Sequence, residues 1–214
     1  MKKPSGKRVA VVGAGPAGLT VAYYLAREGH AVTIYDAMPE PGGMLRYGIP
    51  QYRLPKEILD KEIDIIRAMG VKFVGNTKVN RDVSLDYLRK HNDAVFLGIG
   101  AWRYSRIGCA GEDTSGVIGG IDFLTEAALN QQAAIGKRVA VIGGGNTAMD
   151  AARTAIRLGA EQVMVLYRRT REEMPAEDIE ITEAEEEGVE FRFLLAPEEI
   201  ISEGGQVAAI RMQK

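Results

Sequence analysis

Two glycine-rich segments of the chain have the residue types and the spacing to bind phosphate groups. Residues 13–18 read GAGPAG, and residues 143–148 read GGGNTA. Glycines spaced in this way between a strand and a helix let the backbone approach a pyrophosphate. The start of the helix then offers free N–H groups and the positive end of its dipole to the anion. Two such segments in one chain predict two dinucleotide sites.

The residue that follows the second strand of each unit distinguishes the two predicted sites. Residues 31–35 and 163–167 read as apolar strands, and they are followed by Asp36 and Arg168. An acid at this position accepts hydrogen bonds from ribose hydroxyls, whereas an arginine accommodates a 2′-phosphate. Guanidinium groups bind phosphate through paired, charge-assisted hydrogen bonds. Residues 168–171 (RRTR), the arginine turn, therefore predict an NADP phosphate pocket, with a solvated basic turn as the alternative.

The elements that must position these residues occur twice with a nearly constant offset. Gly143 follows Gly13 by 130 residues, and Arg168 follows Asp36 by 132. The β-branched runs before the glycines are typical of parallel strands buried on both faces. The chain is therefore predicted to have an α/β fold of two Rossmann-like, three-layer dinucleotide-binding domains. Their expected limits are residues 1–120 and 121–214.

Further elements follow from the periodicity of apolar residues and from the turn residues. Strands are expected at 9–12, 71–74, 94–97, 189–195 and 207–212, and helices at 16–29, 55–69, 84–90, 121–132 and 172–187. Residues 39–50 are too rich in Gly and Pro for a helix or strand interior, so they are interpreted as a functional loop, with a plain connection as the alternative. The acidic 172–187 helix is expected to be mostly exposed, with its charges forming a solvated face.

The start of the second glycine-loop helix carries three polar residues. Asn146 and Thr147 could cap its N–H groups or contact phosphate. Asp150 is expected in the first turn, where a carboxylate stabilises the helix dipole, with direct contact to the ligand as the alternative.

Composition limits the possible functions. Of 214 residues, 46% are hydrophobic and 26% charged, and the net charge is −2, which does not suggest a nucleic-acid partner. Cys109 is the single cysteine, so an internal redox disulfide of the thioredoxin reductase type cannot form. No apolar stretch has the length of a signal-peptide core or of a membrane span. A cytoplasmic protein without membrane contact is expected.

Three stretches, residues 42–55, 143–150 and 167–176, together resemble the small (beta) subunit of NADPH-dependent glutamate synthase and related FAD/NAD(P)-binding oxidoreductases. The resemblance covers nearly the whole chain. It implies that the first unit binds FAD and the second binds NADPH, with hydride passing from the nicotinamide to the flavin. It also implies an electron-accepting partner, such as the glutamate synthase large subunit or an iron–sulfur protein.

The resemblance also implies which residues contact each cofactor. The FAD side would comprise Gly13, Gly15, Pro16, Ala17, Gly18, Asp36, Ala37, Gly42, Gly43, Leu45, Arg46, Gly48, Ile49, Val79, Gly98 and Gly100. The NADPH side would comprise Gly143, Gly145, Asn146, Thr147, Ala148, Arg168 and Arg169. No side chain is expected to act as a catalytic acid or base, because the protein mainly orients two cofactor rings.

Two departures from the family leave alternatives open. The family's FAD domain is completed by strands that follow the NADPH domain, so the chain is expected to be an N-terminal fragment whose C-terminal part is missing. It also begins directly at the FAD motif, without an iron–sulfur region. The alternatives are a nucleotide-binding fragment without turnover and an NADPH:ferredoxin-type electron-transfer flavoprotein. Exposed strand edges would also allow a homo-oligomer.

Overall fold

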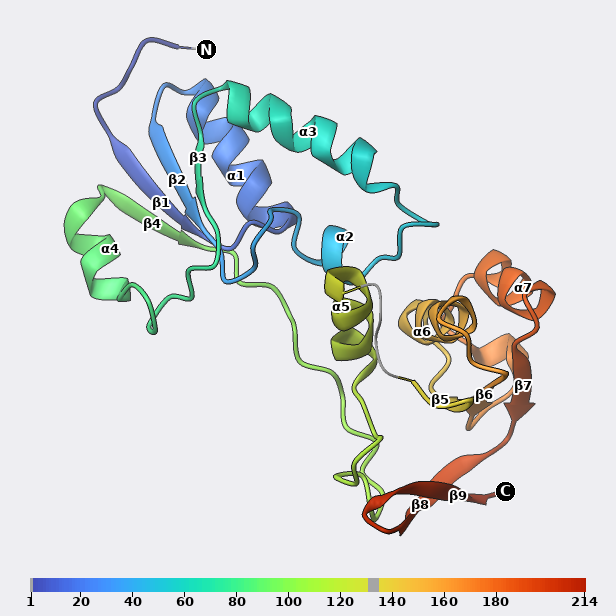
Figure 1. The fold of residues 1–214 in the computed structure, drawn as a ribbon. Coiled ribbons are helices and arrows are strands. Elements are labelled where there is room, and N and C mark those ends of the chain that lie inside the picture. The colour runs from blue at the N-terminus through green and yellow to red at the C-terminus, as the bar shows by residue number, and fades with distance from the viewer. Residues whose placement is uncertain (1, 131–134) are drawn as a thin grey trace. The chain divides into compact units, whose positions relative to one another are not determined.

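The chain forms two compact units, Met1–Ala101 (unit 1) and Trp102–Lys214 (unit 2), each built on a parallel sheet (Figure 1). The computed structural model describes residues 2–130 and 135–214. The expected end of the 121–132 helix therefore lies outside the described residues. Within the described ranges, no helix is long and apolar enough to cross a membrane.

Unit 1 is a three-layer structure. Its sheet has the order β3-β2-β1-β4, all parallel, from β1 (Arg8–Val12), β2 (Ala31–Tyr35), β3 (Lys72–Val74) and β4 (Ala94–Leu97). Helices α1 (Pro16–Arg27) and α3 (Lys56–Ala68) cover one face, and α4 (Leu85–His91) covers the other (Figure 1). Alternate residues of β1 point into the two cores, with Val11 on the α1 side and Val12 on the α4 side. This burial confirms the prediction that the run before the first glycine loop is a parallel strand covered on both faces.

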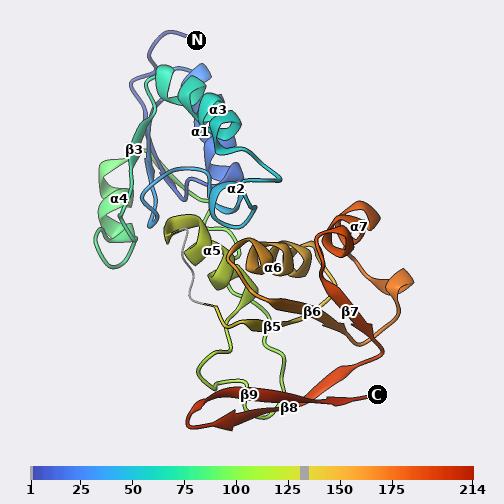
Figure 2. The same ribbon diagram turned by 45° about the vertical axis from the view of Figure 1, so that its right-hand side comes forward.

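Unit 2 repeats the strand–loop–helix–strand pattern. Its sheet has the order β5-β6-β7, from β5 (Arg138–Ile142), β6 (Gln162–Tyr167) and β7 (Glu190–Phe193). Helices α5 (Gly120–Asn130), α6 (Asn146–Arg157) and α7 (Asp178–Glu186) pack on one side of this sheet (Figure 2). Met149, Val165 and Ile181 are fully buried at the centre of the shared core. The repeated units confirm the predicted α/β fold with parallel sheets. The expected burial on both faces holds for β1 but not for β5, in which no residue is fully buried.

Two predicted segments differ in the structure. The Gly/Pro-rich loop contains one helical turn, α2 (Met44–Tyr47), because the Tyr47 and Gly48 N–H groups bond to the carbonyls of Gly43 and Met44. The single helix expected over 172–187 is wrong. The segment is divided into the 3₁₀ turn η1 (Arg171–Glu173) and α7, because Pro175 holds Met174 in an extended conformation between them.

Unit 2 ends in an antiparallel hairpin of β8 (Ala196–Glu203) and β9 (Gln206–Gln213). Only β9 was predicted from the sequence. The turn between the strands consists of Gly204 and Gly205, which both have positive φ. The hairpin is bonded to the segment between β4 and α5, because the Ile200 N–H donates to the Ala110 carbonyl oxygen at 2.8 Å.

Candidate phosphate-binding sites

Three glycine-containing segments of unit 1 converge beside the carboxyl end of β1. A Cβ atom built on Gly13 would lie 2.2 Å from the carbonyl oxygen of Gly98, and one built on Gly43 would lie 2.6 Å from the Cα of Gly15. The N–H of Gly42 donates to the Ala14 carbonyl at 2.8 Å. Glycine is required because the backbones touch. The structure thus brings together predicted site residues from three separate parts of the chain.

Helix α1 begins directly at this convergence. Gly15 is its N-cap and makes no side-chain cap hydrogen bond, and Pro16 and Ala17 are exposed in the first turn. A Cβ on Gly18 would lie 1.8 Å from the carbonyl oxygen of Gly13, so the loop can close only around a glycine. Because no side chain of the described residues caps this helix, its first N–H groups are available to an anion such as a pyrophosphate.

Asp36 stands at the end of β2 and binds the glycine loop. Its Oδ2 accepts a hydrogen bond from the Ala14 N–H at 2.5 Å, and its Oδ1 accepts one from the Met38 N–H at 2.7 Å. An ionised carboxylate offers about four acceptor positions. Two therefore remain for the paired hydroxyls of a ribose. Ala37, the next residue, is exposed.

The 41–50 loop residues predicted for the flavin side have contacts within unit 1. The Arg46 Nε donates to the Pro41 carbonyl at 2.6 Å, and the Arg46 guanidinium also pairs with Asp60 on α3. Leu45 packs against the core beneath α1 and α3. A Cβ on Gly48 would lie 2.9 Å from the sulfur of Met44, which fixes the tight end of α2. These contacts give the loop a defined shape.

Sequence reasoning missed two side chains that hold this loop. The Lys56 Nζ donates to the carbonyl oxygens of Leu45 at 2.9 Å and Ile49 at 2.6 Å. The Tyr47 hydroxyl is bonded to both the N–H and the carbonyl of Glu40, and burial raises the pKa of Tyr47. A single lysine and a single tyrosine with backbone partners leave no motif in a sequence.

The remaining predicted FAD-side residues are placed differently from one another. Gly98 closes onto Gly13, as described above, while Gly100 has a φ of +69° and is exposed just beyond it. Val79 forms a bridge with Val83 and packs in the small core on the α4 side of the sheet. Of these three residues, Gly98 lies where the glycine-containing segments converge, whereas Val79 packs elsewhere in unit 1 and Gly100 is exposed.

The second glycine loop has the same construction. Gly143 has a φ of +141°, and Gly145 is the N-cap of α6 without a side-chain cap hydrogen bond. Ala148 is buried at the position that corresponds to Gly18. Thr147 is exposed in the first turn. The start of α6 is therefore also open to an anion.

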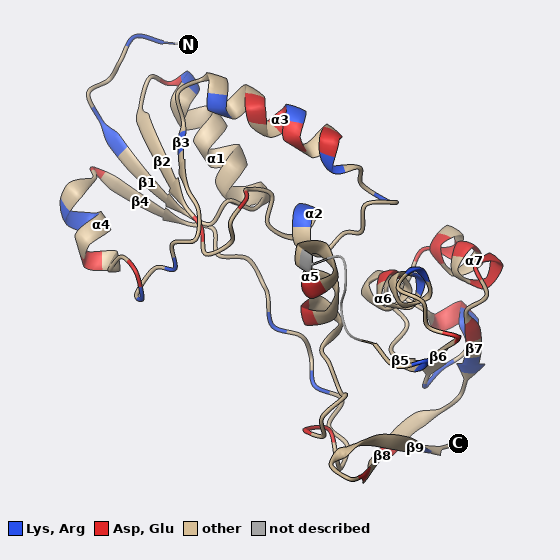
Figure 3. Ribbon diagram, in the orientation of Figure 1, with Lys and Arg blue, Asp and Glu red and all other residues tan. Residues whose placement is uncertain are grey.

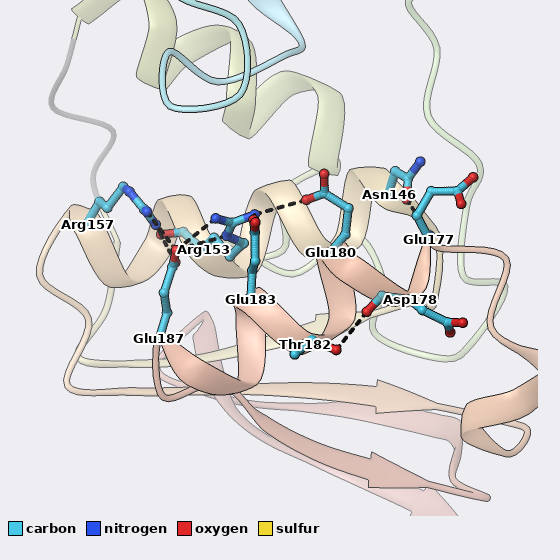
Figure 4. Close-up of polar contacts among 9 residues, drawn as sticks. All are labelled: Asn146, Arg153, Arg157, Glu177, Asp178, Glu180, Thr182, Glu183 and Glu187. Carbon is cyan, nitrogen blue, oxygen red and sulfur yellow. Dashed lines mark hydrogen bonds and ion pairs between the residues drawn. The ribbon is translucent and has the colours of Figure 1, made fainter.

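Two polar residues of α6 are placed differently from one expected role each, while the expected phosphate contact of Asn146 stays a prediction. The Asn146 Oδ1 accepts the N–H of Glu177 at 3.1 Å, so this side chain caps the start of α7 and not that of α6 (Figure 4). Asp150 is only 4% exposed and lies beyond the first turn, so the expected role at the helix dipole is wrong.

The arginine turn presents two of its guanidinium groups to solvent. Arg168 and Arg169 are exposed, and no ion pair in the described part of the chain involves either one. Arg171 instead pairs with Glu185 on α7. The backbone of the turn is fixed, because the Arg169 carbonyl accepts the N–H of Leu194 at 3.2 Å. Arg168 and Arg169 are thus the residues that could bind a phosphate monoester.

The acidic helix α7 (Figure 3) forms a network of ion pairs with α6 (Figure 4), in which Arg153 is buried. Arg153 is 5% exposed and lies 2.9 Å from Glu180, 2.7 Å from Glu183 and 2.8 Å from Glu187. Hydrogen bonds from Arg157 and Arg153 lower the pKa of Glu187 to about 2. The predicted solvated face is therefore wrong for Glu180, which is buried, and this network fixes α7 on α6.

Comparisons with known proteins agree with this arrangement. The chain is 49% identical to the NADPH-Fe(3+) oxidoreductase subunit beta of Geobacter sulfurreducens, over 98% of this chain and 32% of that protein. It is 43% identical to the glutamate synthase [NADPH] small chain of Escherichia coli, over 98% of this chain and 47% of that protein. The chain thus spans between about a third and a half of the length of these relatives.

Solved structures share the fold. Mycobacterium tuberculosis FprA in complex with NADPH superposes with a TM-score of 0.78 at 21% identity, covering 98% of this chain and 67% of FprA. This likeness concerns the fold alone. A family profile described as pyridine nucleotide-disulphide oxidoreductase matches residues 7–214. The resemblance found in the motifs is confirmed, and the chain belongs to the pyridine nucleotide-disulphide oxidoreductase family.

Proposed function

We propose that unit 1 binds FAD and unit 2 binds NADPH, as parts of an oxidoreductase that reduces its flavin with NADPH. The observation that carries the proposal is the pair of uncapped helix starts with opposite charges beside them. Asp36 stands beside the first, and Arg168 and Arg169 follow the corresponding strand of the second. An acid suits a free ribose, and arginines suit a 2′-phosphate.

The residues of the chain bind and orient the two cofactors. Residues 13–18 and 143–148 would receive the pyrophosphates on backbone N–H groups, and Asp36 would accept the ribose hydroxyls of FAD. Arg168 and Arg169 would hold the 2′-phosphate, which NADH lacks. When bound, the flavin supplies the ring that takes hydride from NADPH.

The electrons are proposed to pass to a partner subunit. Relatives carry the names of subunits, including an NADP(+)-dependent formate dehydrogenase subunit beta from Moorella thermoacetica that is 50% identical over 97% of this chain and 30% of that protein. The glutamate synthase small chain is another such subunit. These names support a role in which this polypeptide is the NADPH-oxidising component of a larger enzyme.

An absorbance spectrum of the purified protein, recorded before and after NADPH under anaerobic conditions, tests the proposal. A flavin spectrum that bleaches supports both sites. A flavin spectrum that NADPH leaves unchanged contradicts the proposal. A colourless protein that still binds NADP⁺ would instead assign the chain a nucleotide-binding role without turnover.

The arginines can be tested separately. Replacing both Arg168 and Arg169 by alanine should raise the KM for NADPH at least about tenfold and leave that for NADH within about twofold, because each charge-assisted hydrogen bond contributes roughly 1.5–3 kcal/mol. Arg192→Ala is the matched control, since this exposed arginine pairs with Glu190 on its own strand. An equal rise of the KM for NADPH and of the KM for NADH would contradict the role of these arginines at the 2′-phosphate.

A further inference from the structure

The side chain of Tyr167 contacts the second glycine loop and η1, the 3₁₀ turn into which the arginine turn continues. Tyr167 is the last residue of β6 and directly precedes the arginine turn. We propose that Tyr167 is a positioning residue that sets the arginine turn relative to the second glycine loop. Its hydroxyl would thereby contribute to the preference for NADPH over NADH. This inference rests on the proposed function of unit 2.

The first contact is between the tyrosine ring and the glycine loop. A Cβ atom built on Gly144 would lie 2.6 Å from Cε2, 2.7 Å from Cδ2 and 3.0 Å from Cζ of Tyr167. The ring therefore packs directly on the backbone of Gly144 and leaves no space for a side chain there. The Gly144 carbonyl also accepts the N–H of Ala176 at 3.0 Å. The loop is thus supported by the residues on both sides of the arginine turn.

The second contact is between the tyrosine hydroxyl and the end of the turn. The Tyr167 hydroxyl donates to the carbonyl oxygen of Glu173 at 2.8 Å. Glu173 is the last residue of η1, and its carboxylate accepts the N–H of Thr170 at 3.2 Å in a capping box. The hydroxyl therefore closes the turn that carries Arg168 and Arg169.

The two contacts of Tyr167 can be separated by substitution. The ring supports the loop for the pyrophosphate, which both NADP⁺ and NAD⁺ contain. The hydroxyl fixes only the turn for the 2′-phosphate, which NAD⁺ lacks. Phenylalanine keeps the ring and removes the hydroxyl. Tyr167→Phe should therefore affect NADP⁺ selectively, which loss of general fold stability would not do.

The test is calorimetric titration of the 214-residue chain and its variants with NADP⁺ and with NAD⁺. Tyr167→Phe should raise the Kd for NADP⁺ about fivefold, as expected for one net hydrogen bond, and should change the Kd for NAD⁺ less than about twofold. Tyr35→Phe is the matched control, because Tyr35 ends β2 as Tyr167 ends β6. It should leave both constants unchanged.

A second variant tests the ring contact. Gly144→Ala places a methyl group where the ring of Tyr167 lies, so it should raise the Kd values for NADP⁺ and for NAD⁺ together. The inference would be overturned if Gly144→Ala bound both nucleotides with the native Kd values, or if Tyr167→Phe left the ratio of the Kd for NADP⁺ to the Kd for NAD⁺ unchanged. Either result would leave the proposed NADPH site intact. A native chain with no preference for NADP⁺ would overturn the proposed function of unit 2 and the inference with it.

Discussion

Replacing Arg153 by methionine should lower the free energy of unfolding of unit 2 by about 3 kcal/mol. The Arg153 and Glu180 side chains are only 6% and 11% exposed, so the substitution leaves a carboxylate without its buried counter-charge. Breaking such a pair typically costs about 3–5 kcal/mol. The lower value applies because Glu187 keeps Arg157 and because Glu183 is 42% exposed and can return to water. Urea unfolding followed by circular dichroism measures the change.

Two further variants test the reasoning behind this value. Arg192→Met breaks an exposed pair with Glu190, whose side chains are 61% and 43% exposed, and should cost less than about 1 kcal/mol. The double variant Arg153→Met with Glu180→Met should recover at least about 1 kcal/mol, because an apolar pair needs no counter-charge. An Arg153→Met cost no larger than that of Arg192→Met, or a double variant less stable than the single one, would refute the argument.

Three other predictions concern acid stability and the FAD side. In the folded protein the pKa of Glu187 is lowered from 4.5 to about 2, so its contribution to the free energy of unfolding is present above about pH 4.5 and is lost as the pH falls toward 2. In acid unfolding experiments, Glu187→Gln should therefore make the free energy of unfolding depend less on pH in this range. Gly18→Ala should abolish flavin absorbance of the purified protein because its methyl group overlaps a carbonyl oxygen, whereas Ala148→Gly, at the corresponding position of unit 2, should retain it. Lys56→Met should speed FAD dissociation about fivefold in stopped-flow fluorescence by releasing two loop carbonyls, while exposed Lys61→Met on the same helix should not.

The sequence predicts features that depend on local patterns. The run Val9–Val12 is apolar at every position, with β-branched valine at three of the four, and all four residues are buried because helices cover both faces of this parallel sheet. The position of Asp36 beside the glycine loop is confirmed by its bond to the Ala14 N–H, because the residue that follows the second strand lies at the same edge of the sheet as the loop, while the role of Arg168 stays a prediction. In these cases the residues that decide the position are neighbours in the sequence, so the position can be predicted from the sequence.

The features that were missed depend on partners far along the chain. Glu180 is buried only because Arg153, 27 residues earlier, brings a counter-charge to it. Strand β8 contains a proline and four charged or hydroxyl residues, and it is stabilised by pairing with β9. Helix α2 lies in a segment of low helix propensity and is held by Lys56. None of these partners can be read from a window of neighbouring residues.

The different attachments of Asp36 and of the two arginines have an evolutionary consequence. Asp36 accepts the N–H of Ala14 in the glycine loop and that of Met38 after β2, so a substitution that alters the proposed ribose recognition also removes hydrogen bonds that hold the fold. Arg168 and Arg169 extend from a backbone that other residues hold. Their side chains can therefore mutate at little structural cost. If the proposed roles of Asp36 and of the two arginines hold, drift among descendants of this chain should change the pyridine nucleotide that they accept while leaving the adenosine recognition proposed for unit 1 constant.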